Sequence, residues 1–148
     1  MNSCRLEKAY RHFGHDITEE DHVLEAGLGF AVKPDKGDFL GRDAVLRKRE
    51  AGLARRLMQF RLTEPDAHLH HNEPLLRDGD IVGHLTSGGY GHALGGAIGL
   101  GYVPCTHPDE APEAMLASAF SVEITGRRIP AEASLAPLYD PKSLRPRA

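Results

Sequence analysis

The sequence has few of the features that mark secreted, membrane or nucleic-acid-binding proteins. Its two cysteines, Cys4 and Cys105, lie in unlike surroundings, so we expect no disulfide framework and a reducing compartment. No apolar run approaches the roughly 18 to 20 residues that span a bilayer, and the first residues lack the apolar centre of a signal peptide. The formal net charge of −3 provides no basic footprint for nucleic acid. We therefore expect a cytoplasmic protein with no membrane or nucleic-acid partner.

Motifs of nucleophilic catalysis and phosphate binding are also missing. Ser87 does not lie in a Gly-x-Ser-x-Gly elbow, and Cys105 follows a proline with no evident base nearby. The glycines at 88–91 and 95–96 precede a predicted strand, whereas a phosphate-binding loop leads into a helix. These glycines are better explained as barrel corners or as places of close approach by another backbone.

What the sequence does contain is a series of short strands. The stretch Leu75–Gly91 holds Asp78-Gly79, a strong hairpin signal, because both residues tolerate positive φ. The 41% of hydrophobic residues allows a packed core. The pattern from about residue 55 predicts six strands, which suggests a closed antiparallel barrel. The expected strands cover 57–62, the two arms of the hairpin, 95–103, 120–124 and 128–135.

The first third of the chain has a different pattern. Apolar spacing predicts a helix over Cys4–Phe13, alternation predicts a strand over Ala26–Lys33, and a dipole-matched charge order predicts a helix over Gly41–Ala51. The first helix resembles the end of a longer unit, and its Leu6, Tyr10 and Phe13 could support a homo-oligomer. We expect an α+β, mostly β fold, with a partial α/β subdomain in residues 1–54 and a six-stranded barrel in residues 55–148.

Histidines suggest a metal site only weakly. His68, His70 and His71 lie within four residues, but no cysteine pair or acidic residue accompanies them at ligand spacing. A solvent-exposed loop is the favoured interpretation, and His12, His15 and His22 carry less signal still. We predict no metal site.

Glu7 is the residue of most chemical interest. One interpretation is an exposed helix carboxylate paired with Arg11 four residues later. The other is a carboxylate partly buried among ring-bearing neighbours, which could accept two N–H groups from an aminopyrimidine-type ring. The pattern alone leaves both open.

Several segments resemble the glycine-cleavage T-protein (aminomethyltransferase) family. They include Arg5-Leu6-Glu7-Lys8-Ala9-Tyr10-Arg11, Asp38-Phe39-Leu40-Gly41-Arg42 and Gly83-His84-Leu85-Thr86-Ser87-Gly88-Gly89-Tyr90. Gly101-Tyr102-Val103 and Leu138-Tyr139-Asp140-Pro141 are similar to the C-terminal folate-binding half of dimethylglycine and sarcosine dehydrogenases. The resemblance extends over nearly the whole chain, and it implies a six-stranded barrel at the C-terminal end.

The resemblance also implies a function. In this family the folate half transfers a one-carbon unit, released when an FAD domain oxidises an N-methyl amine, to tetrahydrofolate. It implies folate-binding roles for Glu7, Lys36 and Tyr139. The family's catalytic aspartate lies upstream of the motif that contains Glu7 and has no counterpart here, so we assign no catalytic residue. The FAD domain is also missing. We expect tetrahydrofolate as the cofactor, an FAD-containing domain or subunit as partner, and no turnover by this chain alone. The alternative is a non-catalytic β-barrel interaction module.

Overall fold

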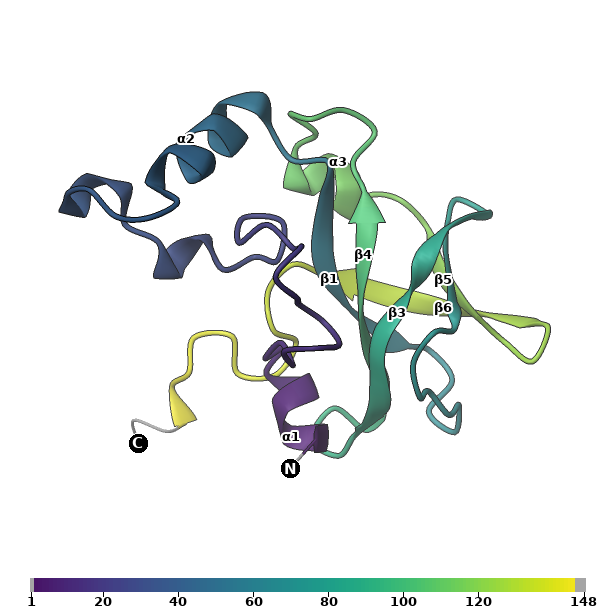
Figure 1. Cartoon of the computed structure of the whole chain (residues 1–148). Helices are drawn as coiled ribbons and strands as arrows, with labels where there is room; N and C mark the ends of the chain where they lie inside the picture. Colours follow the sequence, from purple (N-terminus) through teal and green to yellow (C-terminus); the bar gives the residue numbers. More distant parts are fainter. Residues whose placement is uncertain (1, 146–148) are drawn as a thin grey trace.

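The computed structural model describes residues 2–145, and its centre is a closed β-barrel (Figure 1). The six strands follow one another around the barrel in the order β1-β4-β3-β2-β5-β6, and every neighbouring pair is antiparallel. This confirms the predicted α+β, mostly β fold with a six-stranded barrel. The strands are β1 Arg55–Leu62, β2 Pro74–Arg77, β3 Asp80–Gly91, β4 Gly96–Pro104, β5 Phe120–Ile124 and β6 Arg127–Ser134.

Large apolar side chains from all six strands fill the barrel. Phe60 in β1 and Phe120 in β5 place their ring centroids 5.5 Å apart, in a tilted arrangement typical of aromatic pairs. Leu75, Leu85 and Val122 are fully buried beside them. These residues are the apolar members of the alternating segments, so the pattern that predicted the strands also predicts the core.

The predicted hairpin forms between β2 and β3. Asp78 has φ of 53° and Gly79 has φ of 96°, the pair of positive values that a type I′ turn requires. Ala119 donates its backbone N–H to the Asp78 carboxylate at 2.8 Å, which ties the turn to the segment before β5. The turn between β5 and β6 repeats this geometry at Thr125 and Gly126, with φ of 48° and 78°.

Gly88 permits a close approach and does not turn a corner. β3 runs without interruption past this residue, after a register shift between Leu85 and Ser87. A Cβ atom on Gly88 would lie 2.8 Å from both the His70 carbonyl oxygen and the Leu69 Cβ. Glycine is therefore needed here so that the loop before β2 can lie directly on β3.

The first third of the chain departs from its predicted elements. Helix α1 spans Asn2–Glu7 and stops six residues short of Phe13, because Ala9 takes a left-handed φ of 51°. The strand predicted at Ala26–Lys33 is wrong. That segment meets no neighbouring strand and forms a single 3₁₀ turn, η1 Gly29–Ala31.

The second predicted helix is confirmed. A second 3₁₀ turn, η2 Pro34–Lys36, precedes α2 Arg42–Ala51, which ends at Gly52 with φ of 80°. One further short helix, α3 Pro112–Leu116, lies between β4 and β5. No helix in residues 2–145 is both long enough and apolar enough to cross a bilayer.

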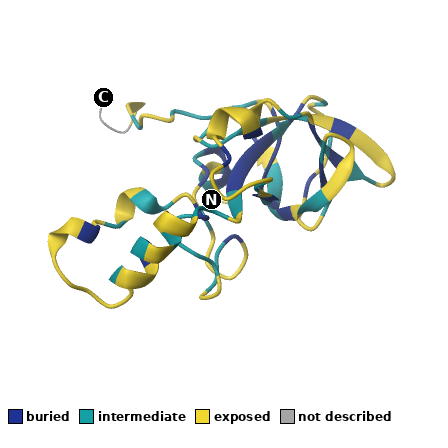
Figure 2. Ribbon diagram, turned by 90° about the horizontal axis from the view of Figure 1, so that it is seen from above, coloured by how far each residue is buried: buried dark blue, intermediate teal, exposed yellow. Residues whose placement is uncertain are grey.

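Part of the N-terminal region projects away from the barrel. Figures 1 and 2 show α2 and the two 3₁₀ turns extending to one side, with mostly exposed side chains. Phe30 is 80% exposed and Leu40 is fully exposed. Leu6, by contrast, is only 1% exposed, because it packs against the barrel, and so it is not available for the self-association considered above. β1 begins at Arg55, and the division into subdomains 1–54 and 55–148 stays a prediction.

Candidate functional site

Glu7 lies at the end of α1, packed against the turn that joins β3 and β4. The residue is only 6% exposed, and its Oε1 accepts the backbone N–H groups of Ala93 at 2.5 Å and Leu94 at 3.3 Å. Arg11 does not face it; that guanidinium donates to the carbonyl oxygens of Ala9 and Ala26, each at 2.8 Å. Burial lowers the pKa of Arg11 in this position. The exposed Glu7–Arg11 pair considered from the sequence is therefore absent.

The two carboxylate oxygens of Glu7 have different surroundings. Both N–H groups from the β3–β4 turn point to Oε1, and no hydrogen bond within residues 2–145 points to Oε2. A carboxylate oxygen has two lone-pair directions, so Oε1 is satisfied by the protein alone. Oε2 is the oxygen that remains able to accept an N–H group from a ligand.

Tyr139 lies directly beside Glu7. Its backbone N–H donates to the Glu7 carbonyl oxygen at 3.4 Å, and its ring lies beneath the cations of Lys8 and Arg145, at 6.0 Å and 5.2 Å from the ring centroid. Lys8 also binds the Asp140 carboxylate at 3.1 Å and the Ser143 hydroxyl at 3.1 Å. These contacts place the segment after β6 against the end of α1.

Gln59 holds this arrangement to the barrel. This buried side chain of β1 donates from Nε2 to the Leu6 carbonyl oxygen at 2.5 Å, and its Oε1 accepts the Leu138 N–H at 2.7 Å. One amide thus joins α1, β1 and the C-terminal segment. The signal of it in the sequence was a glutamine between the apolar residues Met58 and Phe60.

Lys36 occupies a separate region. It ends η2, is exposed, and borders a shallow depression formed by Ala31, Val32, Gly37 and Phe39. Within residues 2–145, no hydrogen bond or ion pair links Lys36 to Glu7 or Tyr139. The structure therefore brings together two of the three residues implied by the resemblance, and the third lies apart.

Arg5 and Asp16 form the most buried ion pair of this region. The Asp16 side chain is fully buried, and its Oδ2 accepts Arg5 Nη1 at 2.6 Å and the His12 backbone N–H at 2.8 Å. Asp16 Oδ1 accepts the Thr86 hydroxyl at 2.5 Å. The Arg5 motif residue thus fastens the loop after α1 onto β3.

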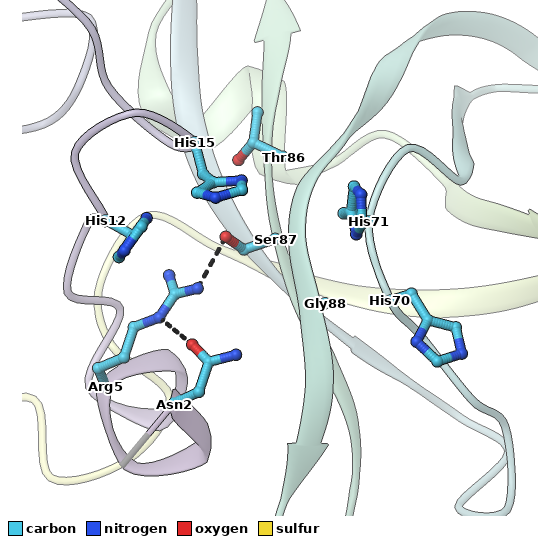
Figure 3. Close-up of a pocket in the computed structure, with 9 residues that line it drawn as sticks. All are labelled: Asn2, Arg5, His12, His15, His70, His71, Thr86, Ser87 and Gly88. Carbon is cyan, nitrogen blue, oxygen red and sulfur yellow. Dashed lines mark hydrogen bonds between the residues drawn. The ribbon is translucent and has the colours of Figure 1, made fainter.

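A cleft of about 590 Å³ lies beside this pair (Figure 3). His12 and His15 come from the loop after α1, and His70 and His71 come from the loop before β2. The ring centroids of His12 and His15 lie 4.7 Å apart, and those of His15 and His71 lie 6.4 Å apart. Sequence spacing could not reveal this cluster, because its two halves are more than fifty residues apart. No group of three or more His, Cys, Asp or Glu side chains among residues 2–145 is arranged to hold a metal ion.

Comparison with known proteins identifies two family models in this chain. The model described as "Glycine cleavage T-protein C-terminal barrel domain" matches residues 55–140, and the "GCVT N-terminal domain" matches residues 1–36. The first match alone accounts for more than half of the chain.

Individual relatives agree with these models. The chain is 40% identical over 146 residues to a 4-methylaminobutanoate oxidase (formaldehyde-forming) of Paenarthrobacter nicotinovorans. That alignment covers 98% of this chain and 17% of the relative. It is also 34% identical over 132 residues to the human mitochondrial dimethylglycine dehydrogenase, in an alignment that covers 88% of this chain and 14% of the relative. A crystal structure of the glycine cleavage system aminomethyltransferase T from Bartonella henselae superposes with a TM-score of 0.79 at 25% identity. That alignment covers 95% of this chain and 38% of the other.

The chain thus spans only 14% to 38% of the length of these three proteins. Within that span the agreement extends from the closed barrel to the α1 motif that contains Glu7. On these matches, the chain belongs to the glycine cleavage T-protein family and corresponds to the C-terminal barrel portion found in aminomethyltransferases and dimethylglycine dehydrogenases.

Proposed function

We propose that this chain forms the C-terminal part of a tetrahydrofolate-binding site and supports transfer of a one-carbon unit from an N-methyl amine to tetrahydrofolate. The folate supplies the nitrogen atoms that accept the one-carbon unit. The chain contributes a wall of the site and a carboxylate that orients the pterin ring. The site residues in this proposal are Glu7, Tyr139 and Lys36.

The observation that carries the proposal is the unequal use of the Glu7 oxygens. Oε1 is fully engaged by Ala93 and Leu94, so the side chain is held in one orientation before any ligand arrives. Oε2 has no hydrogen-bond donor in the described chain and can accept an N–H group of an aminopyrimidine-type ring. A charged acceptor gives a stronger hydrogen bond than a neutral one, which suits recognition of such a ring.

Tyr139 and Lys36 have different parts in this proposal. The Tyr139 ring, already placed beside α1 by Lys8 and Arg145, offers an aromatic surface next to Glu7. Lys36 has no ion-pair partner among the described residues and would act on the anionic end of folate, away from the pterin. Its position on a short exposed turn leaves its side chain free to reach a ligand.

We further propose that a second unit completes the site. Small-molecule sites enclose most of their ligand, whereas Glu7 and Tyr139 form a single wall. The exposed Phe30 and Leu40 provide an apolar surface that a further domain or subunit would cover. That unit would supply the catalytic aspartate and an FAD-containing part that oxidises the amine. Both units would be cytoplasmic in this proposal.

Calorimetric titration of the chain with tetrahydrofolate tests the proposal. We expect micromolar binding by the natural sequence and loss of binding by Glu7→Gln. That variant keeps an oxygen for Ala93 but replaces the charged oxygen with either a donor or a neutral acceptor. Glu113→Gln, an exposed change on α3, is the matched control and should bind normally.

Two results would count against the proposal. Absence of tetrahydrofolate binding by the folded chain would favour the alternative of a non-catalytic interaction module. Equal binding by the natural sequence and Glu7→Gln would remove Glu7 from the site. Separately, folate-dependent turnover by the chain alone would contradict the need for a second unit.

A further inference from the structure

The histidine cleft between the N-terminal segment and the barrel has no part in the function proposed above. Glu7 and Tyr139 do not line it. Its walls are Arg5 and Asn2 of α1, His12 and His15 of the following loop, Thr86, Ser87 and Gly88 of β3, and His70 and His71 of the loop before β2. Figure 3 shows the four imidazoles reaching it from both sides of β3.

Arg5 is the cationic hydrogen-bond donor of the lining. Arg5 donates to Asn2 Oδ1 at 2.7 Å, to the Tyr10 carbonyl oxygen at 3.3 Å, to Asp16 at 2.6 Å and to Ser87 Oγ at 2.9 Å. A guanidinium has five N–H groups, so one remains unused. Because Arg5 occupies the acceptor atom of Asn2, the amide NH₂ of Asn2 is left to face a ligand.

The ring nitrogens of the four histidines are also uncommitted. All four residues are exposed and line the cleft. No hydrogen bond within residues 2–145 involves the rings of His12, His15, His70 or His71. The His70 backbone N–H is bound to Glu73 Oε1 at 2.8 Å, which fixes the loop without using the imidazole. The rings can therefore bind a ligand without giving up a contact in the protein.

Among the residues that the structure describes, no carboxylate side chain lines the cleft to offset the charge of Arg5. Asp16 is fully buried behind Arg5 and is satisfied by Arg5, Thr86 and the His12 backbone N–H. Glu73 lies behind the His70 loop, with Oε1 in use and Oε2 buried without a partner.

This composition selects an anion over a metal ion. A cation would meet a guanidinium and no carboxylate, and the described histidines do not converge in a metal-binding arrangement. An oxyanion, in contrast, would meet the Arg5 guanidinium and the Asn2 amide NH₂, and charge-assisted hydrogen bonds such as those from a guanidinium are among the strongest in proteins.

We propose that the cleft lined by Arg5, His12, His15, His70 and His71 is a binding site for a small dianionic oxyanion of the phosphate or carboxylate type. The site is distinct from the proposed folate site, because none of Glu7, Lys36 and Tyr139 lines the cleft.

Sulfate is the appropriate probe, because it remains a dianion near neutral pH. We expect calorimetry to show saturable sulfate binding by the natural sequence. The double variant His12→Gln/His15→Gln, at two exposed positions, should weaken this binding by about tenfold. A parallel titration with oxalate, also a dianion here, distinguishes a phosphate-type ligand from a carboxylate.

The matched control is His92→Gln/His107→Gln, which removes two exposed histidines outside the cleft. It should keep the affinity of the natural sequence. NMR shifts of the Ser87 amide and the His12 ring provide a second measurement that does not rely on the variants. Absence of binding by both oxyanions would overturn the proposal. Equal losses of affinity in the two double variants would also overturn it.

Discussion

The Glu7 carboxylate binds the backbone N–H of Ala93, which lies 86 residues later in the chain. This 2.5 Å contact joins helix α1 to the turn between β3 and β4. The same side chain is therefore a candidate ligand contact and a structural support. Experiments on Glu7 must separate the two roles.

Replacement of Glu7 by alanine should destabilise the chain as well as remove ligand binding. The N–H groups of Ala93 and Leu94 would lose their acceptor in a partly buried position, at a cost of about 2 kcal/mol. Glu7→Gln keeps an acceptor oxygen and should cost less than about 1 kcal/mol. Urea denaturation of both variants measures the difference, and equal losses would show that the charge itself supports the turn.

Replacement of Asp16 by asparagine should be among the most damaging single changes. It would leave the Arg5 guanidinium, which is 19% exposed, without the charged partner supplied by the fully buried Asp16, at a cost of about 3 kcal/mol. Asp66→Asn changes an exposed aspartate in the loop after β1 and is the control. Chemical denaturation of both proteins tests this, and an Asp16→Asn loss no greater than that of the control would contradict it.

Glu110 should make the protein sensitive to acid. Hydrogen bonds from the Arg77 guanidinium, the nearer at 2.6 Å, lower the pKa of Glu110 to about 2. A carboxyl with a depressed pKa in the folded state contributes stability that is complete above its unfolded pKa, near 4.5, and is lost as the pH falls toward 2.

We therefore expect Glu110→Gln to reduce the slope of the free energy of unfolding against pH in the acid range, because one fewer proton is taken up on unfolding. The natural sequence should lose stability between about pH 4.5 and 2 more steeply than the variant. Denaturation curves at several pH values measure this, with Glu113→Gln as the exposed control. Parallel acid limbs for the natural sequence and Glu110→Gln would show that the Arg77 pair does not control this range.

Two glycines of the barrel should respond differently to the same change. A Cβ on Gly88 would lie 2.8 Å from the backbone oxygen of His70, whereas a Cβ on Gly96 has nothing closer than 3.7 Å. We expect Gly88→Ala to cost about 2 kcal/mol through overpacking and Gly96→Ala to be far milder. Thermal denaturation of the two variants compares them directly, and similar melting temperatures would refute the close approach at Gly88.

The exposed apolar surface should cause self-association in the isolated chain. Changing Phe30 and Leu40 together to serine should reduce association while altering stability by less than about 0.5 kcal/mol, since neither side chain is buried. Sedimentation velocity at high concentration is the measurement. A purely monomeric natural sequence would remove this argument for a partner surface.

The barrel was predictable because its signals are local. Alternating residues in 57–62 and 120–124 and positive-φ turns at Asp78-Gly79 are each readable within a few positions. With six strands predicted, few arrangements other than a closed barrel would bury their apolar faces. Closure through the β1–β6 pair follows from that count and not from any one residue.

The N-terminal third was harder because tertiary contacts override its pattern. Apolar spacing in 4–13 suits a helix, yet the chain reverses after Glu7, where Gln59 and Arg11 bind its backbone carbonyls. Alternation in 26–33 suits a strand, but no neighbouring strand is available to pair with it. Both errors concern contacts with residues distant in sequence.

The site shows the same division. Glu7 and Tyr139 were implied by motif resemblance, and the folded chain brings them together. The role of Gln59 and the meeting of His12 and His15 with His71 could not be anticipated, because each depends on how separate loops pack on β3 and β1. The candidate site and the histidine cleft therefore depend on contacts between residues that are distant in the sequence.

Closure of the barrel has a consequence for biosynthesis. β1 needs both β4 and β6 as neighbours, and Leu138 must reach Gln59, 79 residues earlier in the chain. A growing chain therefore exposes an incomplete sheet with unpaired strand edges, which is prone to aggregation, until β6 has left the ribosome. Folding dominated by such distant pairings is slow, so chaperone dependence and sensitivity to premature stop codons should both follow from the order of these strands.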